Sequence, residues 1–157
     1  MVEIAAKSKT ELVLMGPFRD QVLFDDLKNS KNWSWVSYLG NLDRRTVEYV
    51  YSRCNLGFVI LHPDENYINS LPIKLFEYMI NGLVVLSSNF PEWKKIITDS
   101  GAGYCIDPFD VETSVDIINN LKSKPSLELE LTKNGIDAAM GKYRWASEAE
   151  KLYLIYN

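Results

Sequence analysis

The chain has 157 residues, which is the size of one ordinary domain and leaves no room for a two-domain enzyme. Hydrophobic residues make up 46% and charged residues 24%, close to the averages of folded globular proteins, so a disordered, collagenous or coiled-coil chain is excluded. The net charge of −4, without a run of five like charges, argues against a nucleic-acid partner.

The chain contains no stretch that predicts a membrane span, a signal peptide or a disulfide framework. The longest apolar runs, at 56–61 and 83–86, are far shorter than the roughly 20 residues of a membrane span. The first residues include Glu3 and lack the apolar core of a signal peptide. The two cysteines, Cys54 and Cys105, lie in or beside apolar runs, and we expect them to be buried free thiols of a protein in a reducing, cytoplasmic compartment.

Five short segments have the composition of β-strands. They are apolar, β-branched or aromatic, and residues with turn propensity follow them. They lie at residues 12–16, 35–40, 56–61, 83–88 and 103–106. Three of them contain uninterrupted apolar runs, LVLM, FVIL and LVVL, which are typical of strands covered on both faces and predict a parallel sheet.

Segments with helical spacing separate these strands. One apolar stripe consists of Leu42, Val47, Val50, Tyr51 and Cys54, and a second consists of Ile73, Phe76, Met79 and Ile80. Pro72 and Pro91 occupy the position of a first helical residue, while Gly82 and Gly101 follow helix ends. The alternation predicts an α/β fold, with a Rossmann-like parallel sheet of about five strands flanked by helices.

After residue 106 the pattern predicts helices alone. Asp110 caps the first of them and Ser126 opens the next. The last is built on the apolar residues Trp145, Ala149, Leu152 and Tyr156. We expect these helices to pack around the sheet.

The beginning of the chain departs from the usual order. Residues 1–8 have the pattern of the second half of a helix that leads into the strand at 12–16, and no strand precedes them. A parallel sheet normally begins with a strand. We therefore expect residues 1–157 to be a single domain that is truncated at its N-terminus, inside its first β-α unit.

The loop after the third strand is the first candidate for a binding site, because ligands of open parallel sheets bind beyond the carboxyl ends of the strands. This loop, HPDENYINSL at 62–71, is longer than an ordinary strand-to-helix turn and has no predicted structure of its own. It leads into a helix that starts at Pro72, whose free N–H groups and dipole favour an anion.

Two charged residues follow on one face of that helix. Lys74 would add a positive charge to the anion site, and the Glu77 carboxylate could accept hydrogen bonds from ribose hydroxyls. A phosphate site beside a carboxylate predicts a bound nucleotide. The alternative is that Lys74 and Glu77 form a solvated ion pair on the helix surface.

The run SLPIKLFEYMINGLVVLSSNFPEW at 70–93 resembles the most recognisable segment of the carboxyl-terminal domain of GT-B glycosyltransferases of family 4, which carry a P-x-K-x-x-E-Y-M-x-x-G-x-P-V-type stretch. The resemblance extends through ELVLMG at 11–16, through residues 38–63 and through SGAGYCIDPFD at 100–110. It therefore covers nearly the whole chain, with one specific motif and several generic ones.

The resemblance implies that the chain is the C-terminal half of a GT-B fold and binds a nucleotide-diphosphate sugar. Glu77 would hold the ribose, and the helix N-terminus would meet the diphosphate. The other donor-binding positions implied are Gly16, Gly40, Asn41, Leu42, Asn69, Ser70, Leu71 and Pro72, of which Gly40 to Leu42 would lie against the base. Asn69 stands where the family has a first glutamate, so either an amide contacts the sugar or the sugar contact has shifted.

The activity implied is that of a retaining glycosyltransferase, which would transfer a sugar to an acceptor hydroxyl in polysaccharide or glycolipid synthesis. Lys74 would stabilise charge on the departing diphosphate. The resemblance implies no cofactor and no metal. The family's Arg and Lys pair and its acceptor-binding N-terminal domain lie outside the chain, so we expect the chain alone to be inactive. The implied partners are that domain and a sugar or lipid-linked acceptor, in the cytoplasm or, for a peripherally bound full enzyme, at the inner face of the membrane.

Other polar residues have simpler interpretations. His62 precedes a proline and is expected to be a turn residue rather than a catalytic one, and the adjacent acids Asp64 and Glu65 point apart and lack a third metal ligand. The alternative function is a non-catalytic nucleotide-binding or scaffold module that docks on a partner chain. A phosphoacceptor receiver is disfavoured, because Met15 and Gly16 provide no paired acids at the end of the first strand.

Overall fold

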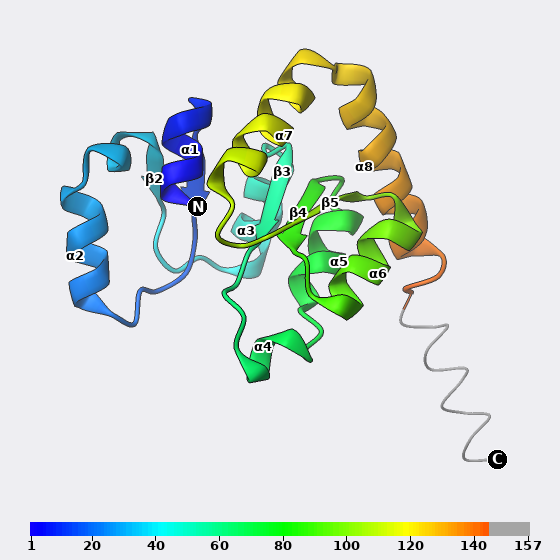
Figure 1. Ribbon diagram of the computed structural model, residues 1–157, viewed down its shortest axis with the longest axis horizontal. Coiled ribbons are helices and arrows are strands. Elements are labelled where there is room, and N and C mark those ends of the chain that lie inside the picture. Colours follow the sequence, from blue (N-terminus) through cyan, green and yellow to red (C-terminus); the bar gives the residue numbers. More distant parts are fainter. Residues whose placement is uncertain (145–157) are drawn as a thin grey trace.

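The structure is a computed structural model in which residues 1–144 are described. Strands and helices alternate along the chain, as Figure 1 shows. The strands are Leu12–Leu14 (β1), Val36–Tyr38 (β2), Leu56–Val59 (β3), Val84–Ser88 (β4) and Gly103–Ile106 (β5). All five predicted strands are confirmed, and their observed ends lie within two residues of the predicted ones.

The helices are α1 (Val2–Ser8), α2 (Gln21–Asn29), α3 (Arg44–Tyr51), α4 (Glu65–Ile68), α5 (Ile73–Ile80), α6 (Pro91–Ser100), α7 (Val111–Ser123) and α8 (Pro125–Met140), with a 3-10 helix η1 (Lys31–Trp35). Asp110 caps α7 as predicted. The predicted helix that contains Trp145 lies outside the described residues.

Three predictions about helix positions need correction. Pro72 is the N-cap of α5 rather than its first residue, and α8 begins at Pro125 rather than Ser126. The loop at 62–71 contains the short helix α4, whose N-terminus is capped by the Asp64 carboxylate accepting from Asn66 N–H at 2.9 Å. An Asp before a helix is a common capping residue, and this signal identifies α4.

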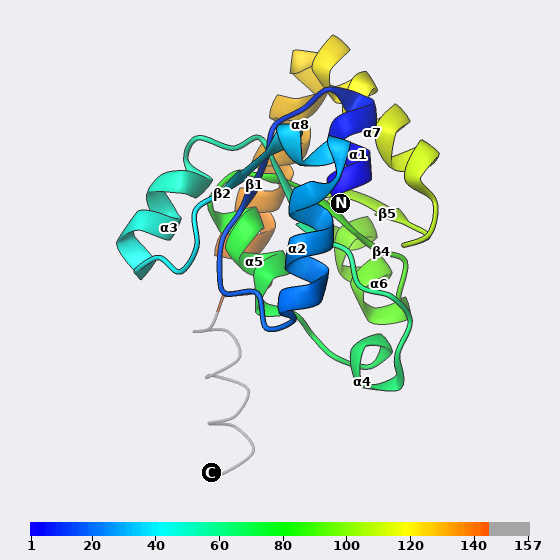
Figure 2. The ribbon, with the colours of Figure 1, turned by 90° about the vertical axis from the view of Figure 1, so that its left-hand side faces the viewer.

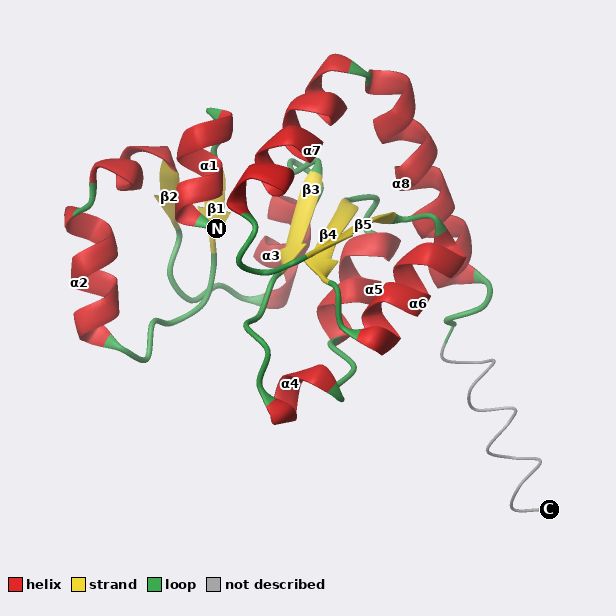
Figure 3. Cartoon of the chain, in the orientation of Figure 1, coloured by secondary structure: helices red, strands yellow, loops and turns green. Residues whose placement is uncertain are grey.

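The five strands form two parallel sheets instead of one continuous sheet. β1 pairs with β2, while β4 lies between β3 and β5. The prediction of a single sheet of about five strands is therefore corrected: the strands and their parallel direction are confirmed, but the ladder is interrupted between β1 and β3. Figures 2 and 3 show the strands with helices on both sides of them.

The larger core lies under the three-stranded sheet. All five residues of β4 are buried, as its apolar sequence predicts for a central strand covered on both faces. Leu75 and Met79 of α5 and Trp93 of α6 are fully buried in this core, and α8 packs against α5. This packing holds the N-terminus of α5 at the carboxyl end of the sheet.

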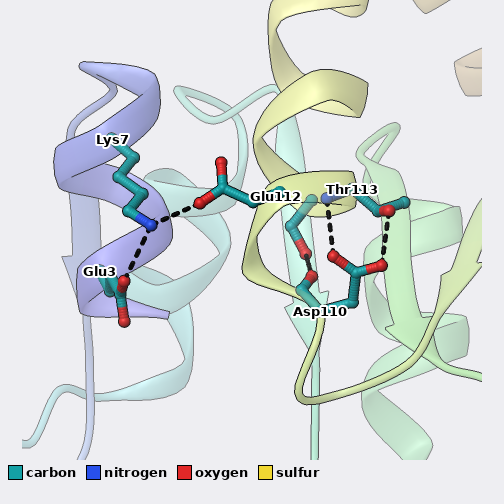
Figure 4. A network of polar contacts seen from close by, with 6 residues as sticks. Glu3, Lys7, Asp110, Glu112 and Thr113 are labelled. Carbon is teal, nitrogen blue, oxygen red and sulfur yellow. Dashed lines mark hydrogen bonds and ion pairs between the residues drawn. The ribbon is translucent and has the colours of Figure 1, made fainter.

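A second, smaller core lies on the opposite face of β3. Ile4 of α1 packs there with Val115 and Ile118 of α7. Figure 4 shows the polar rim of this contact, in which Lys7 of α1 pairs with both Glu3 and Glu112. These groups are exposed, so the burial of apolar side chains is the main stabilising contribution.

Both cysteines are free thiols, as predicted, but each is only partly buried, which corrects the expectation of full burial. Cys54 follows α3 and lines a cavity, and Cys105 lies within hydrogen-bonding distance of Ser87 Oγ, at 3.3 Å. Burial raises the pKa of both thiols. Among residues 1–144, no helix has the length and apolar character needed to cross a membrane.

Candidate functional site

A cavity of about 610 Å³ lies between the two sheets. Its sides are formed by β1 and β3, and it reaches from Thr10, just before β1, to Gly16, just after it. Asn41 and Leu42, in the loop after β2, and Lys74 of α5 also line the cavity. One end of the cavity therefore lies at the carboxyl ends of the strands, where ligands of open parallel sheets bind.

Two glycines connect the loops at this end. Gly16 N–H donates to the Gly40 carbonyl at 2.7 Å, and the Tyr38 hydroxyl donates to the Gly16 carbonyl at 3.0 Å. Gly16 has φ +105° and Gly40 has φ +65°, which are backbone conformations that glycine adopts without the steric penalty of a Cβ. The loops after β1 and β2 are thus held together at the mouth of the cavity.

The N-terminus of α5 approaches the same region. No side chain of the described residues caps this helix, and the first backbone hydrogen bond runs from Leu75 N–H to the Pro72 carbonyl at 3.1 Å. The N–H groups of the first turn and the exposed Lys74 side chain give this region a positive electrostatic potential. An anionic ligand group is favoured there.

Glu77, predicted to lie on the same face, points toward α3. Its Oε1 atom lies 3.6 Å from Arg44 Nη1, and Arg44 Nε also pairs with Glu48 at 3.0 Å. Glu77 is absent from the cavity lining, whereas Lys74 and Tyr78, its neighbours on α5, are part of it. The Glu77 carboxylate thus lies beside the cavity, held by a largely exposed arginine that the sequence analysis missed.

The remaining predicted donor-binding residues lie on the loop before α5. The indole N–H of Trp93, a fully buried residue, donates to the Ser70 carbonyl at 2.6 Å and anchors this loop to α6. Leu71 is exposed, and the Asn69 side-chain amide donates to the Glu65 carbonyl of the same loop at 3.5 Å. The structure brings Gly16, Asn41, Leu42 and Lys74 together around the cavity, while Asn69, Ser70, Leu71 and Pro72 are not part of its lining.

Two tyrosines form an aromatic wall of the cavity that the sequence analysis did not assign to the site. Tyr51 of α3 and Tyr78 of α5 pack edge to face, with ring centroids 5.3 Å apart. Burial raises the pKa of both hydroxyl groups. The predicted helical stripe that contains Tyr51 indicated its burial but not its position beside a cavity, and Tyr78 was not part of the predicted stripe of its helix.

His62 and the two acids after Pro63 do not form a reaction centre. The imidazole of His62 is exposed and stacks on Phe109, with ring centroids 4.6 Å apart. Asp64 caps α4, and Glu65 is exposed in its first turn. Within residues 1–144, no group of three His, Cys, Asp or Glu side chains is arranged to hold a metal ion.

Parallel strands flanked by helices, with a cavity at the carboxyl ends of the strands, define a Rossmann-like α/β domain. The family described as "Glycosyl transferases group 1" matches residues 1–138, and the chain belongs to this family. The family assignment confirms the resemblance noted in the sequence. No curated protein matches the chain.

Solved structures with the same fold include several glycosyltransferases. The C-terminal domain of the group 1 glycosyl transferase LpcC from Francisella tularensis has a TM-score of 0.77 at 20% identity, over 92% of this chain and 77% of that one. Alr3699/HepE from Anabaena, solved in complex with UDP-glucose, has a TM-score of 0.81 at 14% identity, over 99% of this chain and 44% of that one. Sucrose-phosphate synthase from Thermosynechococcus elongatus has a TM-score of 0.78 at 19% identity, over 99% of this chain and 41% of that one.

At these identities the likeness shows the fold. The chain spans about two fifths of the length of HepE and of the synthase. It corresponds to the C-terminal domain of a GT-B glycosyltransferase, as the match to the isolated LpcC domain also indicates.

Proposed function

We propose that this chain is the donor-binding domain of a retaining glycosyltransferase and that it binds a nucleotide-diphosphate sugar. The observation that carries the proposal is the meeting of Gly16, Asn41, Leu42 and Lys74 around one cavity at the carboxyl ends of parallel strands, in a chain of the group 1 family. HepE, a structural neighbour, has been solved with UDP-glucose. That complex supports the same class of donor here.

Three groups of residues bind three parts of the donor, which are the diphosphate, the ribose and the base. The first turn of α5 and Lys74 hold the diphosphate, because that helix end is uncapped and positive. Glu77 accepts hydrogen bonds from the ribose, and residues 40–42 contact the base. Stabilisation of the departing diphosphate by Lys74 and the helix N-terminus then contributes to catalysis when the sugar moves to its acceptor.

Arg44 has to be included in this arrangement. It lies 3.6 Å from the Glu77 carboxylate, so a ribose hydroxyl that binds Glu77 competes with this ion pair. The Arg44 side chain is 77% exposed, and ion pairs between exposed groups contribute little to stability because solvent screens them. Arg44 can therefore move away from Glu77 at small cost when the donor binds.

The complete reaction needs parts that this chain does not supply. An N-terminal domain binds the sugar or lipid-linked acceptor, and the chain alone is inactive in transfer. The donor is the only small molecule required, without a cofactor or metal ion. We place the full enzyme in polysaccharide or glycolipid synthesis in the cytoplasm, at the inner face of the membrane where the acceptor is lipid-linked.

Thermal unfolding in the presence of millimolar UDP, GDP or ADP tests the proposal. At least one nucleotide is expected to raise the melting temperature of the chain, and Glu77→Ala is expected to abolish the shift. Asp64→Ala is the matched control, because Asp64 caps α4 away from the cavity. Stabilisation by none of the nucleotides would favour a scaffold module, and equal losses in the two variants would show that the ribose site is misplaced.

A further inference from the structure

The 62–71 loop, which contains Asn69 and leads to the N-terminus of α5, buries little of its own surface. Residues 62–67, 69 and 71 are exposed, while the half-buried Ile68 packs against the larger core. A segment with few buried contacts opens easily unless other interactions hold it. The two ends of this loop are therefore the places where its conformation can be fixed.

At the start of the loop, a side chain continues the pairing of β3 with β4. The regular ladder between these strands ends at the pair Val59 and Ser87. Leu61 lies two residues beyond this pair, directly before the loop. The Ser88 hydroxyl accepts from Leu61 N–H at 2.9 Å and donates to the Leu61 carbonyl at 2.8 Å. One side chain thus makes the two hydrogen bonds that backbone groups make in a ladder.

Ser88 is itself held firmly by the sheet. It is the last residue of β4, the middle strand of the three-stranded sheet, and its side chain is fully buried. The next residue, Asn89, donates its backbone N–H to the Ile106 carbonyl of β5 at 2.9 Å. A buried hydroxyl that both donates and accepts is fixed in orientation, because rotation would break one of its hydrogen bonds.

The other end of the loop is anchored by the same β-α unit. The indole N–H of Trp93, in the first turn of α6, donates to the Ser70 carbonyl at 2.6 Å. Ser88 and Trp93 belong to β4 and α6, which pack against each other. A single buried unit therefore holds both ends of the loop, and α5 begins at Ile73, shortly after the second anchor.

We propose that Ser88 is a positioning residue of the donor site, which fixes the start of the 62–71 loop and so the way in which Asn69 and the N-terminus of α5 are presented to the donor. This inference rests on the proposed function. Ser88 acts through the backbone of Leu61, because its hydroxyl is buried and bonded there. A loop that is already ordered lowers the entropic cost of binding, so the hydroxyl contributes to donor affinity without touching the donor.

Amide hydrogen exchange without nucleotide is the first test. Ser88→Ala removes the hydroxyl, and Ser87→Ala is the matched control: both serines are fully buried in β4, but the Ser87 hydroxyl lies 3.3 Å from the sulfur of Cys105 in β5. Exchange of the Leu61 amide is expected to be faster in Ser88→Ala than in Ser87→Ala by about tenfold or more. Equal exchange in the two variants would overturn the proposal, because the hydroxyl would then not hold the start of the loop.

Nucleotide affinity is the second test, measured by calorimetry with whichever of UDP, GDP and ADP binds the unsubstituted chain best. The titrations are made well below the melting temperature of each variant, so that a loss reports the site and not the folded fraction. Ser88→Ala is expected to weaken binding by at least about threefold, and Ser87→Ala by less than about twofold. Equal affinities of the two variants would overturn the positioning role.

Ser88→Thr separates the hydroxyl from the packing of the strand. Threonine keeps the hydroxyl and suits a β-strand, so this variant is expected to recover both the slow exchange of Leu61 and the affinity. Losses as large as those of Ser88→Ala would overturn the proposal, because packing would then be the cause. Failure of the unsubstituted chain to bind any of the three nucleotides would instead refute the proposed function, whereas the exchange comparison involves no nucleotide and tests the hold of Ser88 on the loop by itself.

Discussion

Replacement of Gly57 by alanine is expected to disturb the aromatic wall of the cavity. A Cβ atom at this position of β3 would lie 2.3 Å from Tyr78 Cδ2 and 2.4 Å from Tyr78 Cγ, far inside van der Waals contact. Gly57 itself is buried, and the Tyr78 ring rests against Tyr51. The methyl group can therefore be accommodated only if the Tyr78 ring moves and its contact with Tyr51 is lost.

The size of the effect follows from the packing. An extra methyl group in a well-packed site destabilises a protein by about 1–3 kcal/mol. For a domain of about 150 residues, 1 kcal/mol corresponds to roughly 2–4 °C in melting temperature. We therefore expect Gly57→Ala to lower the melting temperature by roughly 2–12 °C.

A double-mutant cycle with Tyr78→Leu separates this clash from a general effect of alanine in the strand. If the ring is the obstacle, Gly57→Ala is expected to cost much less in the Tyr78→Leu background, with a coupling of about 0.5–3 kcal/mol between the two sites. Chemical denaturation of the four proteins measures this coupling. Equal losses in both backgrounds would refute the reasoning, because the clash with Tyr78 would then not be the cause.

Three further predictions concern single contacts. Hydrogen bonds to the Asp110 carboxylate lower its pKa in the folded state. The ionised carboxylate therefore stabilises the fold at neutral pH, and this contribution is lost as the pH falls below about 4. The melting temperature of Asp110→Asn is expected to fall less between about pH 5 and pH 3 than that of the unsubstituted chain. Arg44→Ala is expected to change nucleoside diphosphate affinity, measured by calorimetry, by less than about fivefold, against a loss above about tenfold for Glu77→Ala. Trp93→Phe leaves the Ser70 carbonyl without its donor and is expected to lower the free energy of unfolding in urea by about 1–3 kcal/mol; an unchanged value would show that this hydrogen bond does not anchor the loop.

The strands could be predicted because a strand that is buried on both faces has an uninterrupted run of apolar residues. Residues 83–88 are almost entirely apolar, and β4 is fully buried. Gly101 and Pro91 predicted the ends of α6 because each fits a particular backbone conformation: Pro91 is in the first turn of the helix, and Gly101 follows its last residue with φ +63°, a conformation that favours glycine. The division into two sheets was not predicted, because an apolar pattern reports burial and not which strands are neighbours.

The candidate site was only partly predictable, since its contacts join distant segments. Lys74 was found through its place in the first turn of a helix, and it does line the cavity. Arg44 belongs to another helix, 33 positions before Glu77, and no local pattern relates the two residues. The donation from Trp93 to Ser70 was missed for the same reason, because an indole N–H can find its acceptor anywhere on a neighbouring segment.

The binding of a nucleoside diphosphate at the cavity is tested most directly by titrating UDP into the isotope-labelled chain and following backbone amide signals by NMR. Shifts are expected at Gly16, Asn41, Leu42 and Lys74, around the end of the cavity at the carboxyl ends of the strands. The amides of residues 134–140, in the second half of α8 and outside the cavity lining, are expected to stay unchanged and provide the internal control. Shifts confined to residues 134–140, or none in the presence of UDP, GDP or ADP at millimolar concentration, would contradict a donor site in this domain.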